Sequence, residues 1–513
     1  MSPQSSYDVV LVGTQLAPLL AGALLAKRGF RVLLVAQDEQ KPTYSPVPDV
    51  MLPREPFNFL PASSPIARRV LTELALHPLF RRRATQVDPA FQLCLPRHRF
   101  EMARDEALLE REIEREFPEV KRTVEELLRT SDRDDALLDR VFDRELTWPP
   151  QTFLERRELA RAAADSPFGK NGTSLDPLAD FPDPHPFRLA LELPARFADN
   201  MDPDYPSALR LVRFFSAWRK GAAVLDEGYA TLRAMLLESI RTHSGEVREP
   251  EKIDAILVRR GAACGVRIAA SGEEIGASWV VVGSPLASLL RLLPDRTPFE
   301  ELFERIGEPV VRYYRYTLNL VVAASGVPEG MSRDVFFVRD PERPLSEANA
   351  LHIEVDPKGA ADRRRICVEA LLPRRGIEDI PEYIEGVRER ILASVGDLVP
   401  FLGNHLLLVD SPHDGRPVFD LEHRARLDPP EPWARGIATM RRVYGFPVST
   451  ALGVSALPVR APIKKLLLAN EQVVPGLGVE GLFLAAWSAA RIVSKADGKK
   501  DWMRRGRWGK LEL

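Results

Sequence analysis

The residues that could bind a nucleotide phosphate lie in the first turn after an N-terminal apolar run. Asp8–Val12 is a short apolar segment that ends at Gly13, and residues 16–24 carry apolar side chains at helical spacing. A phosphate-binding turn uses Gly-x-Gly-x-x-Gly, because the first glycine makes the turn, the second admits the pyrophosphate and the third lets helix and strand pack closely. This chain has Gly13, Gln15 and Pro18 at those positions. The turn glycine is kept, but a side chain lies where the pyrophosphate would bind.

The elements around this turn predict a strand–helix–strand unit. The helix is expected to stop at Gly29, and Arg31–Val35 is a second apolar strand. An acidic residue at the end of that strand would bind ribose hydroxyls, but the position holds Ala36, with Asp38 and Glu39 just beyond it. Two interpretations stay open. Either the unit is a scaffold whose ligand site has been lost, or it binds a nucleotide through altered contacts.

The rest of the chain predicts further helices and strands around this unit. Charged amphipathic helices are expected over residues 104–142 with a break at Pro118, whereas residues 40–66 read as an extended connection and 145–206 as mostly loop. Further strands are expected at 253–258, 265–269, 278–282, 317–322, 350–355, 366–371 and 465–469, and helices at 67–83, 229–243, 383–397 and 482–495.

The composition is that of a globular protein, and the length of the chain favours two interleaved domains. The chain has 513 residues, 45% of them hydrophobic, and a formal net charge of -2, which argues against a nucleic-acid partner. Its three cysteines are far apart, so neither a disulfide framework nor a metal site is expected. Met1–Tyr7 lacks the pattern of a signal peptide, and no apolar run is long enough for a transmembrane helix. A cytoplasmic location is expected.

Four stretches of the chain together resemble a known family. Tyr7–Val35 is similar to its N-terminal strand–helix–strand, and Arg104–Leu128 to its helical insertion. Asp226–Ile268 resembles the segment that returns to the cofactor domain, and Lys464–Val493 the C-terminal motif that closes over the flavin. In order and spacing they resemble the phytoene desaturase and carotenoid isomerase group of FAD-dependent oxidoreductases, within the amine-oxidase superfamily.

The resemblance implies an α/β fold, a Rossmann-like FAD-binding domain interleaved with an α+β substrate domain. The FAD-binding domain is expected to comprise residues 1–95, 221–300 and 446–513, and the helical and substrate domain residues 96–220 and 301–445. The resemblance also implies a set of cofactor-site positions, with Ile253 meeting adenine through its backbone. They are Gly13, Gln15, Leu16, Ala36, Ile253, Asn470, Gly478 and Gly481.

The departures from the family all fall on the cofactor site. Gln15, Pro18 and Ala36 replace two glycines and an acid, and the family's C-terminal Gly-Asp is Ala469-Asn470. The family's Gly-Gly-Arg segment is missing, and its Pro-x-Gly-Gly-Met turn is reduced to residues 225–229. FAD is therefore the implied cofactor, and whether it binds is open.

Two functions follow. The first is an FAD-dependent oxidoreductase of desaturase or isomerase type acting on an apolar, isoprenoid-like substrate, in which the flavin carries the chemistry and no catalytic residue is identified. The alternative is a non-catalytic protein of the same fold that has lost FAD and binds a lipid or protein partner. The GDP-dissociation inhibitors of Rab proteins share this architecture, and Val10–Pro18 is superficially similar to their opening turn.

Other candidate residues have simpler explanations. Ser411–Asp414 holds Ser, His and Asp in sequence, but triads are built across a fold, so a surface turn is expected. Phe214, Phe215 and Trp218 are expected to pack in the core, although they could line a substrate tunnel or touch a membrane. The tail Trp502–Lys510 interleaves aromatic and basic residues, which is compatible either with peripheral contact to an anionic membrane or with no role.

Overall fold

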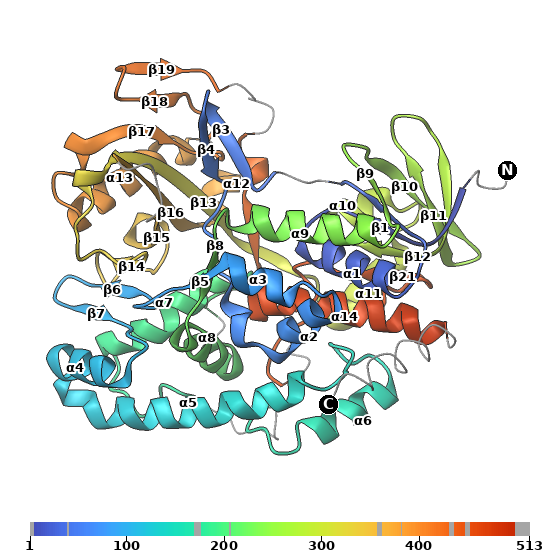
Figure 1. Cartoon of the computed structure of the whole chain (residues 1–513), viewed down its shortest axis with the longest axis horizontal. Coiled ribbons are helices and arrows are strands. Elements are labelled where there is room, and N and C mark those ends of the chain that lie inside the picture. Colours follow the sequence, from blue (N-terminus) through green and yellow to red (C-terminus); the bar gives the residue numbers. More distant parts are fainter. Residues whose placement is uncertain are drawn as a thin grey trace.

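The structure of the chain is a computed structural model. It describes residues 5–37, 41–168, 176–204, 207–356, 362–380, 382–429, 435–446 and 452–497. Two β-sheets lie side by side, with a layer of long helices below them in the view of Figure 1. The predicted tail at 502–510 and the acidic pair Asp38 and Glu39 lie outside the described residues.

The first sheet is built around the predicted strand–helix–strand unit. Within the described residues it has seven strands. They are, in spatial order, β10 (Ile253–Arg259), β11 (Ala262–Ile268), β12 (Glu274–Val282), β1 (Ser5–Val12), β2 (Val32–Val35) and β9 (Glu246–Arg248), with β21 (Leu466–Leu468) also pairing with β12. The pairs β12–β1, β1–β2, β2–β9 and β12–β21 are parallel, whereas β10–β11 and β11–β12 are antiparallel. β2, β21 and the C-terminal halves of β1 and β12 are continuous apolar runs, because both faces of the sheet are covered there, whereas the edge strand β9 is Glu-Val-Arg.

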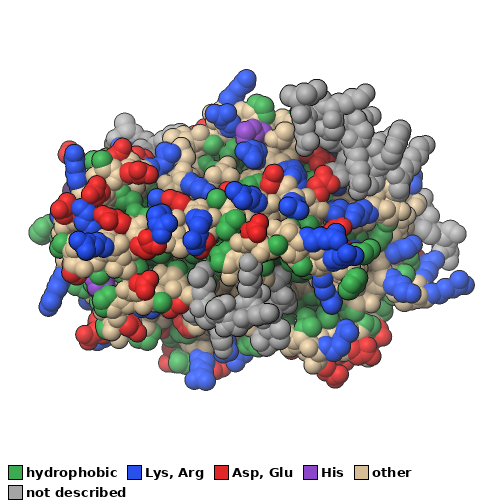
Figure 2. Space-filling view, turned by 90° about the horizontal axis from the view of Figure 1, so that it is seen from below, with side chains coloured by type: hydrophobic (Ala, Val, Ile, Leu, Met, Phe, Trp, Pro, Cys, Tyr) green, Lys and Arg blue, Asp and Glu red, His purple; other side chains and the backbone are tan. Residues whose placement is uncertain are grey.

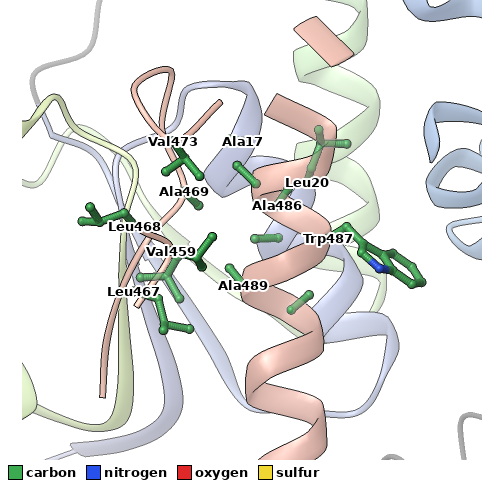
Figure 3. Close-up of a cluster of buried hydrophobic side chains, with 14 of the residues drawn as sticks. Ala17, Leu20, Val459, Leu467, Leu468, Ala469, Val473, Ala486, Trp487 and Ala489 are labelled. Carbon is green, nitrogen blue, oxygen red and sulfur yellow. The ribbon is translucent and has the colours of Figure 1, made fainter. Parts of the chain in front are cut away.

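Helices from three distant parts of the chain cover this sheet. They are α1 (Leu16–Lys27), α9 (Tyr229–Thr242) and α14 (Gly478–Ala496). Leu16 to Ala26 are all buried, because α1 contacts the sheet and also both of the other helices. Figure 3 shows Ala17 and Ala486 on the sides of α1 and α14 that approach each other, where small side chains allow close packing.

The helix α14 is apolar on several sides because, like α1, it contacts both the sheet and neighbouring helices. Figure 3 shows Trp487 on the opposite side of α14 from Leu467 and Leu468. The Trp487 ring is covered by the guanidinium groups of Arg28 and Arg69, at 5.1 and 5.5 Å from its centroid. Contrary to the expectation from the sequence, the segment Pro475–Ala496 is long and apolar enough to span a membrane, but 89% of its most apolar stretch is buried inside the protein, as in a core helix.

The second sheet carries the remaining large part of the chain. It has ten strands among the described residues, and its main path ends with β14 beside β6 and β7. In spatial order they are β19 (Ala425–Leu427), β18 (Val418–Asp420), β17 (Leu406–Asp410), β13 (Val310–Ala323), β16 (Arg363–Pro373), β15 (Ala350–Asp356), β14 (Asp334–Val338), β6 (Gln92–Cys94) and β7 (Arg99–Glu101), with β20 (Arg441–Gly445) also pairing with β13. One face packs against α13 (Val387–Leu398) in an apolar core. β6 belongs to this sheet, although the predicted boundaries place it with residues 1–95.

The layer of helices below the sheets comes from the predicted insertion and beyond. Its members are α4 (Glu106–Glu116), α5 (Lys121–Phe142), α6 (Phe153–Ala162), α7 (Leu189–Ala198) and α8 (Ala208–Lys220). The predicted break at Pro118 is confirmed. Figure 2, seen from below, shows acidic and basic side chains interspersed over this face. Phe214, Phe215 and Trp218 are buried in the core that α8 shares with the second sheet, as expected.

Two expectations about local structure are wrong, and a third is incomplete. The described part of residues 145–206 is mostly loop, as expected, but it also contains α6 and α7, the latter with Pro194 inside it. Residues 40–66 are not simply extended, because β3 (Thr43–Val47) and β4 (Val50–Pro53) pair. Ser411 and His413 are buried rather than on a surface turn, and Asp414 forms an ion pair with Arg388.

Shorter elements complete the fold. They are α2 (Pro65–Glu73), α3 (His77–Arg83), β5 (Ala84–Gln86), β8 (Ala223–Leu225), α10 (Leu286–Leu292), α11 (Thr297–Ile306) and α12 (Arg374–Asp379). β5 pairs with β8, and this short ribbon lies beside the opening between the two sheets.

Candidate functional site

A cavity of about 1380 Å³ lies between the two sheets. Gln15 and Leu16 line it from the start of α1, and Asn470 and Gly478 line it from the C-terminal segment. Its opposite wall is the face of β13, β15 and β16 that does not pack on α13. Of the predicted residues, Gly13, Ala36, Ile253 and Gly481 do not line it, although Lys252, directly before Ile253, does.

The turn after β1 is closed by its own side chain. Gly13 has φ +100°, a conformation that favours glycine. The Gln15 side chain folds back over it, and Oε1 would lie 2.5 Å from a Cβ at position 13. This oxygen is buried, has no hydrogen-bond partner among the described residues, and is an acceptor, as phosphate oxygens are. The space that a pyrophosphate needs is therefore taken by a group that does not complement it.

Pro18 is compatible with close packing of α1 on the sheet because the glycine that permits this approach lies on the sheet side of the contact, at Gly283. A Cβ on Gly283, at the end of β12, would lie 2.3 Å from Pro18 Cγ. The close approach that the third glycine of the motif normally permits is made here by Gly283. The pattern of one strand and one helix could not show this, since Gly283 lies 265 residues after Pro18 in the chain.

The position predicted to meet adenine is occupied by another part of the chain. Ile253 N–H donates to Gln37 Oε1 at 3.0 Å, and both residues are buried. Gln37 follows Ala36 directly at the end of β2. Its side-chain amide thus makes the contact that the resemblance assigns to the adenine ring. Nearby, Thr14 is fully buried and accepts a hydrogen bond from Arg233.

The C-terminal residues of the predicted site are engaged within the protein. Asn470 Nδ2 donates to the carbonyl of Ser284 at 2.9 Å, and its Oδ1 accepts from Gln472 N–H at 3.0 Å. A Cβ on Gly478 would lie 2.2 Å from the carbonyl oxygen of Ala198, and one on Gly481 would lie 2.1 Å from that of Val474. Close approach of the chain to itself therefore explains both glycines without a ligand.

These contacts decide how well FAD fits. The structure brings the eight predicted residues to one edge of the first sheet, at the ends of β1, β2 and β21 and the starts of α1, α14 and β10. The adenosine and pyrophosphate positions, however, are filled by Gln37 and Gln15. The residues present therefore do not fit the adenosine half of FAD.

The inner wall of the cavity is charged, which the sequence did not predict. Arg315 on β13 donates to Glu369 on β16 at 2.7 Å. His352 on β15 lies between two carboxylates, with Nε2 2.9 Å from Asp334 Oδ1 and Nδ1 3.7 Å from Glu369 Oε2. Arg333 pairs with Asp334 and also with Glu354. The result is a continuous buried network across four neighbouring strands.

The network shifts the pKa of its members. Burial by itself would lower the pKa of His352, but its hydrogen bond to Asp334 and the adjacent carboxylate of Glu369 outweigh burial and raise the pKa to about 9. His352 is therefore protonated at neutral pH. His413, also on the cavity wall, differs, because burial and then the charge of Arg54 lower its pKa to about 3.

Aromatic side chains flank the charged network. The Phe336 ring stacks on His352 with centroids 4.8 Å apart, and Trp218 meets Phe336 edge-on at 5.7 Å. Phe197 lies 5.9 Å from the His352 ring. The described residues hold no group of three or more His, Cys, Asp or Glu arranged for a metal ion. Because its wall combines aromatic rings with charged side chains, the cavity can accommodate a ligand that has both an apolar and a charged part.

Comparison with known proteins addresses the fold. No protein-family model and no curated protein matches the chain. An oxidoreductase from Methanosarcina mazei superposes with a TM-score of 0.58 at 12% identity, covering 94% of this chain and 99% of its own. Putrescine oxidase bound to putrescine superposes with a TM-score of 0.56 at 15% identity, covering 96% and 99%.

A protein from Pyrococcus furiosus is similar to the same extent, with a TM-score of 0.54 at 15% identity and coverage of 95% and 97%. The chain therefore shares the overall fold of these solved structures. The predicted α/β class is thus confirmed. At such low identity the likeness concerns the fold alone, and the chemistry must be argued from the site.

Proposed function

We propose that this protein is a non-catalytic member of the FAD-binding oxidoreductase fold that binds a small ligand in the cavity between its two sheets. The proposal rests on one observation. Gln37 Oε1 accepts a hydrogen bond from the Ile253 N–H, the backbone donor that the resemblance assigns to adenine. Gln15 over Gly13 and the engaged amide of Asn470 support it. The cavity itself persists beyond these contacts.

The second candidate is the FAD-dependent oxidoreductase acting on an apolar isoprenoid-like substrate. The size of the cavity and its extension to the start of α1 favour it. Its lining does not, because the wall of β13, β15 and β16 presents Arg315, His352 and Glu369. A long apolar chain on such a wall would leave the buried Nε donors of Arg315 and Arg333 without an acceptor.

The experiment that tests the proposal is a flavin titration of the purified protein. We expect no flavin absorption band and no rise in Tm with excess FAD, since a ligand that binds the folded state must stabilise it. Flavin released in stoichiometric amount on denaturation would overturn the proposal.

A double variant tests the reason for the exclusion. Gln15→Gly combined with Gln37→Ala should acquire an FAD-dependent rise in Tm that the wild type lacks. If the variant is as indifferent to FAD as the wild type, these two side chains are not what excludes the cofactor.

A further inference from the structure

The inner end of the cavity combines an aromatic wall with hydrogen-bond donors that the protein leaves unused. Phe197, Trp218 and Phe336 line the cavity beside Arg315 and Arg333. Ring contacts link Trp218 to Phe336, and Phe336 and Phe197 to His352. Arg315 also donates to the Phe197 carbonyl at 3.2 Å, so the aromatic and cationic groups form one neighbourhood.

The acidic groups of this neighbourhood are all engaged by the chain. Glu369 is held by Arg315 and His352, and Asp334 by Arg333, His352 and Asn58. Glu354 is held by Arg333 and by the Phe57 N–H. A cationic ligand would therefore compete with pairs that are already formed.

The unused groups are N–H donors. The Nε atoms of Arg315 and Arg333 and the indole Nε1 of Trp218 are buried and have no hydrogen-bond partner among the described residues. The Arg315 side chain is 5% exposed and Trp218 is 2% exposed. A buried donor without an acceptor is costly, and guanidinium and indole N–H groups are best matched by a carboxylate. These buried N–H groups would therefore be satisfied by a ligand that carries a hydrogen-bond acceptor.

We propose that this end of the cavity binds an aromatic carboxylate, whose ring packs against Phe197 and Trp218 and whose carboxylate accepts from Arg315. The inference rests on the proposed function, because it requires the cavity to hold a ligand other than FAD. Planar apolar bodies with one charged end suit a pocket of aromatic walls and few converging donors.

The test compares three probes of the same shape and different charge. We expect 2-naphthoate at about 1 mM to raise Tm by about 2 °C or more, with saturable binding by calorimetry. The neutral 2-naphthamide and the cationic 2-naphthylmethylamine should leave Tm unchanged. The inference is overturned if the amide or the amine matches the acid, or if none of the three shifts Tm.

Variants locate the binding. Arg315→Gln with Glu369→Gln removes the donor and its partner together and should weaken 2-naphthoate at least about tenfold, a loss of about 1.4 kcal/mol. Arg28→Gln with Glu73→Gln is the matched control, because that pair is similarly buried, at 3% and 6% exposure, and does not line the cavity. Equal binding by both double variants would overturn the assignment to Arg315.

Trp218→Phe keeps the ring and removes the indole N–H, and serves if the first variant does not fold. It should bind 2-naphthoate more weakly than the wild type, and unchanged binding would overturn a role for that N–H. The flavin titration of the same preparation keeps the two ideas apart. A yellow protein that still binds 2-naphthoate refutes only the proposed function, whereas a colourless protein indifferent to 2-naphthoate refutes only the carboxylate subsite.

Discussion

At the scale of single residues, His352 shows how a charged side chain is stabilised in the wall of the cavity. Two carboxylates lie beside its ring nitrogens and Phe336 covers its ring, so a charged imidazolium is buried between opposite charges. Arg333 and Arg315 then balance the acids from the far sides. Breaking one member of such a network leaves its partners buried and uncompensated, which costs more than the pair contributes.

The raised pKa of His352 predicts how stability depends on pH. Its folded-state pKa of about 9 lies above the ordinary 6.5, so the folded state holds the proton more tightly. The contribution is complete below pH 6.5 and is lost as pH rises towards 9, an effect of about 3 kcal/mol at most. Chemical denaturation at a series of pH values should show the free energy of unfolding falling across this window.

Two variants check the assignment. His352→Gln should lose this pH dependence, whereas His413→Gln should keep it, because His413 is buried but stays neutral with a pKa of about 3. A wild-type slope that survives in His352→Gln would assign the proton to another group.

At the scale of elements, α1 approaches the end of β12 more closely than its own sequence suggests. The contact is between Pro18 and Gly283, at the place where a nucleotide-binding helix normally has glycine. The close packing of helix and sheet survives although the phosphate contacts do not. The packing and the ligand site of this motif are therefore separable.

The contact can be tested by a double-mutant cycle. Gly283→Ala should destabilise the protein by about 1–3 kcal/mol, because its Cβ would overlap the Pro18 ring. Pro18→Ala should relieve most of that loss in the double variant, giving a coupling energy measured by denaturant unfolding. Gly396→Ala on α13 is the control, since nothing lies within 4 Å of its Cβ. Additive effects of the two substitutions would show that α1 and β12 do not meet there.

The sequence predicted elements better than it predicted the cavity. Apolar runs identified β1, β2, β12, β15 and β16, because short buried strands depend mainly on local residue type. α7 was missed because Pro194 lies inside it. Arg315 and Thr317 alternate with apolar residues on β13, which reads as a solvent-facing side until another sheet covers it. The contact of Gln37 with Ile253 spans 216 residues, and no local pattern carries it.

At the scale of the whole molecule, the chain passes repeatedly between the two sheets. Residues 5–35, 246–282 and 466–468 form the first sheet, and residues 92–101 and 310–445 supply the second. One apolar cluster contains side chains from Val9 to Val493. Neither sheet is complete until distant parts of the chain have met, so the two should unfold together.

We therefore expect a single unfolding transition by calorimetry. Trp487→Ala on α14 should destabilise this transition as a whole by about 3–5 kcal/mol without splitting it, because the side chain is 1% exposed in the shared core. Phe153→Ala is the control, since that ring is 76% exposed, and should change stability by less than about 0.5 kcal/mol. Two separate transitions, only one of them sensitive to Trp487→Ala, would contradict this expectation.

The side chain of Gln37 has a consequence for the life of the protein in the cell. An enzyme whose fold is completed by a vitamin-derived molecule depends on the supply of that vitamin, and the unloaded form is exposed to proteolysis. Here the amide that satisfies Ile253 is part of the polypeptide and is present from synthesis. Its local concentration cannot be diluted, and it cannot be lost by dissociation. Under the proposed function, maturation of this protein would be independent of riboflavin nutrition.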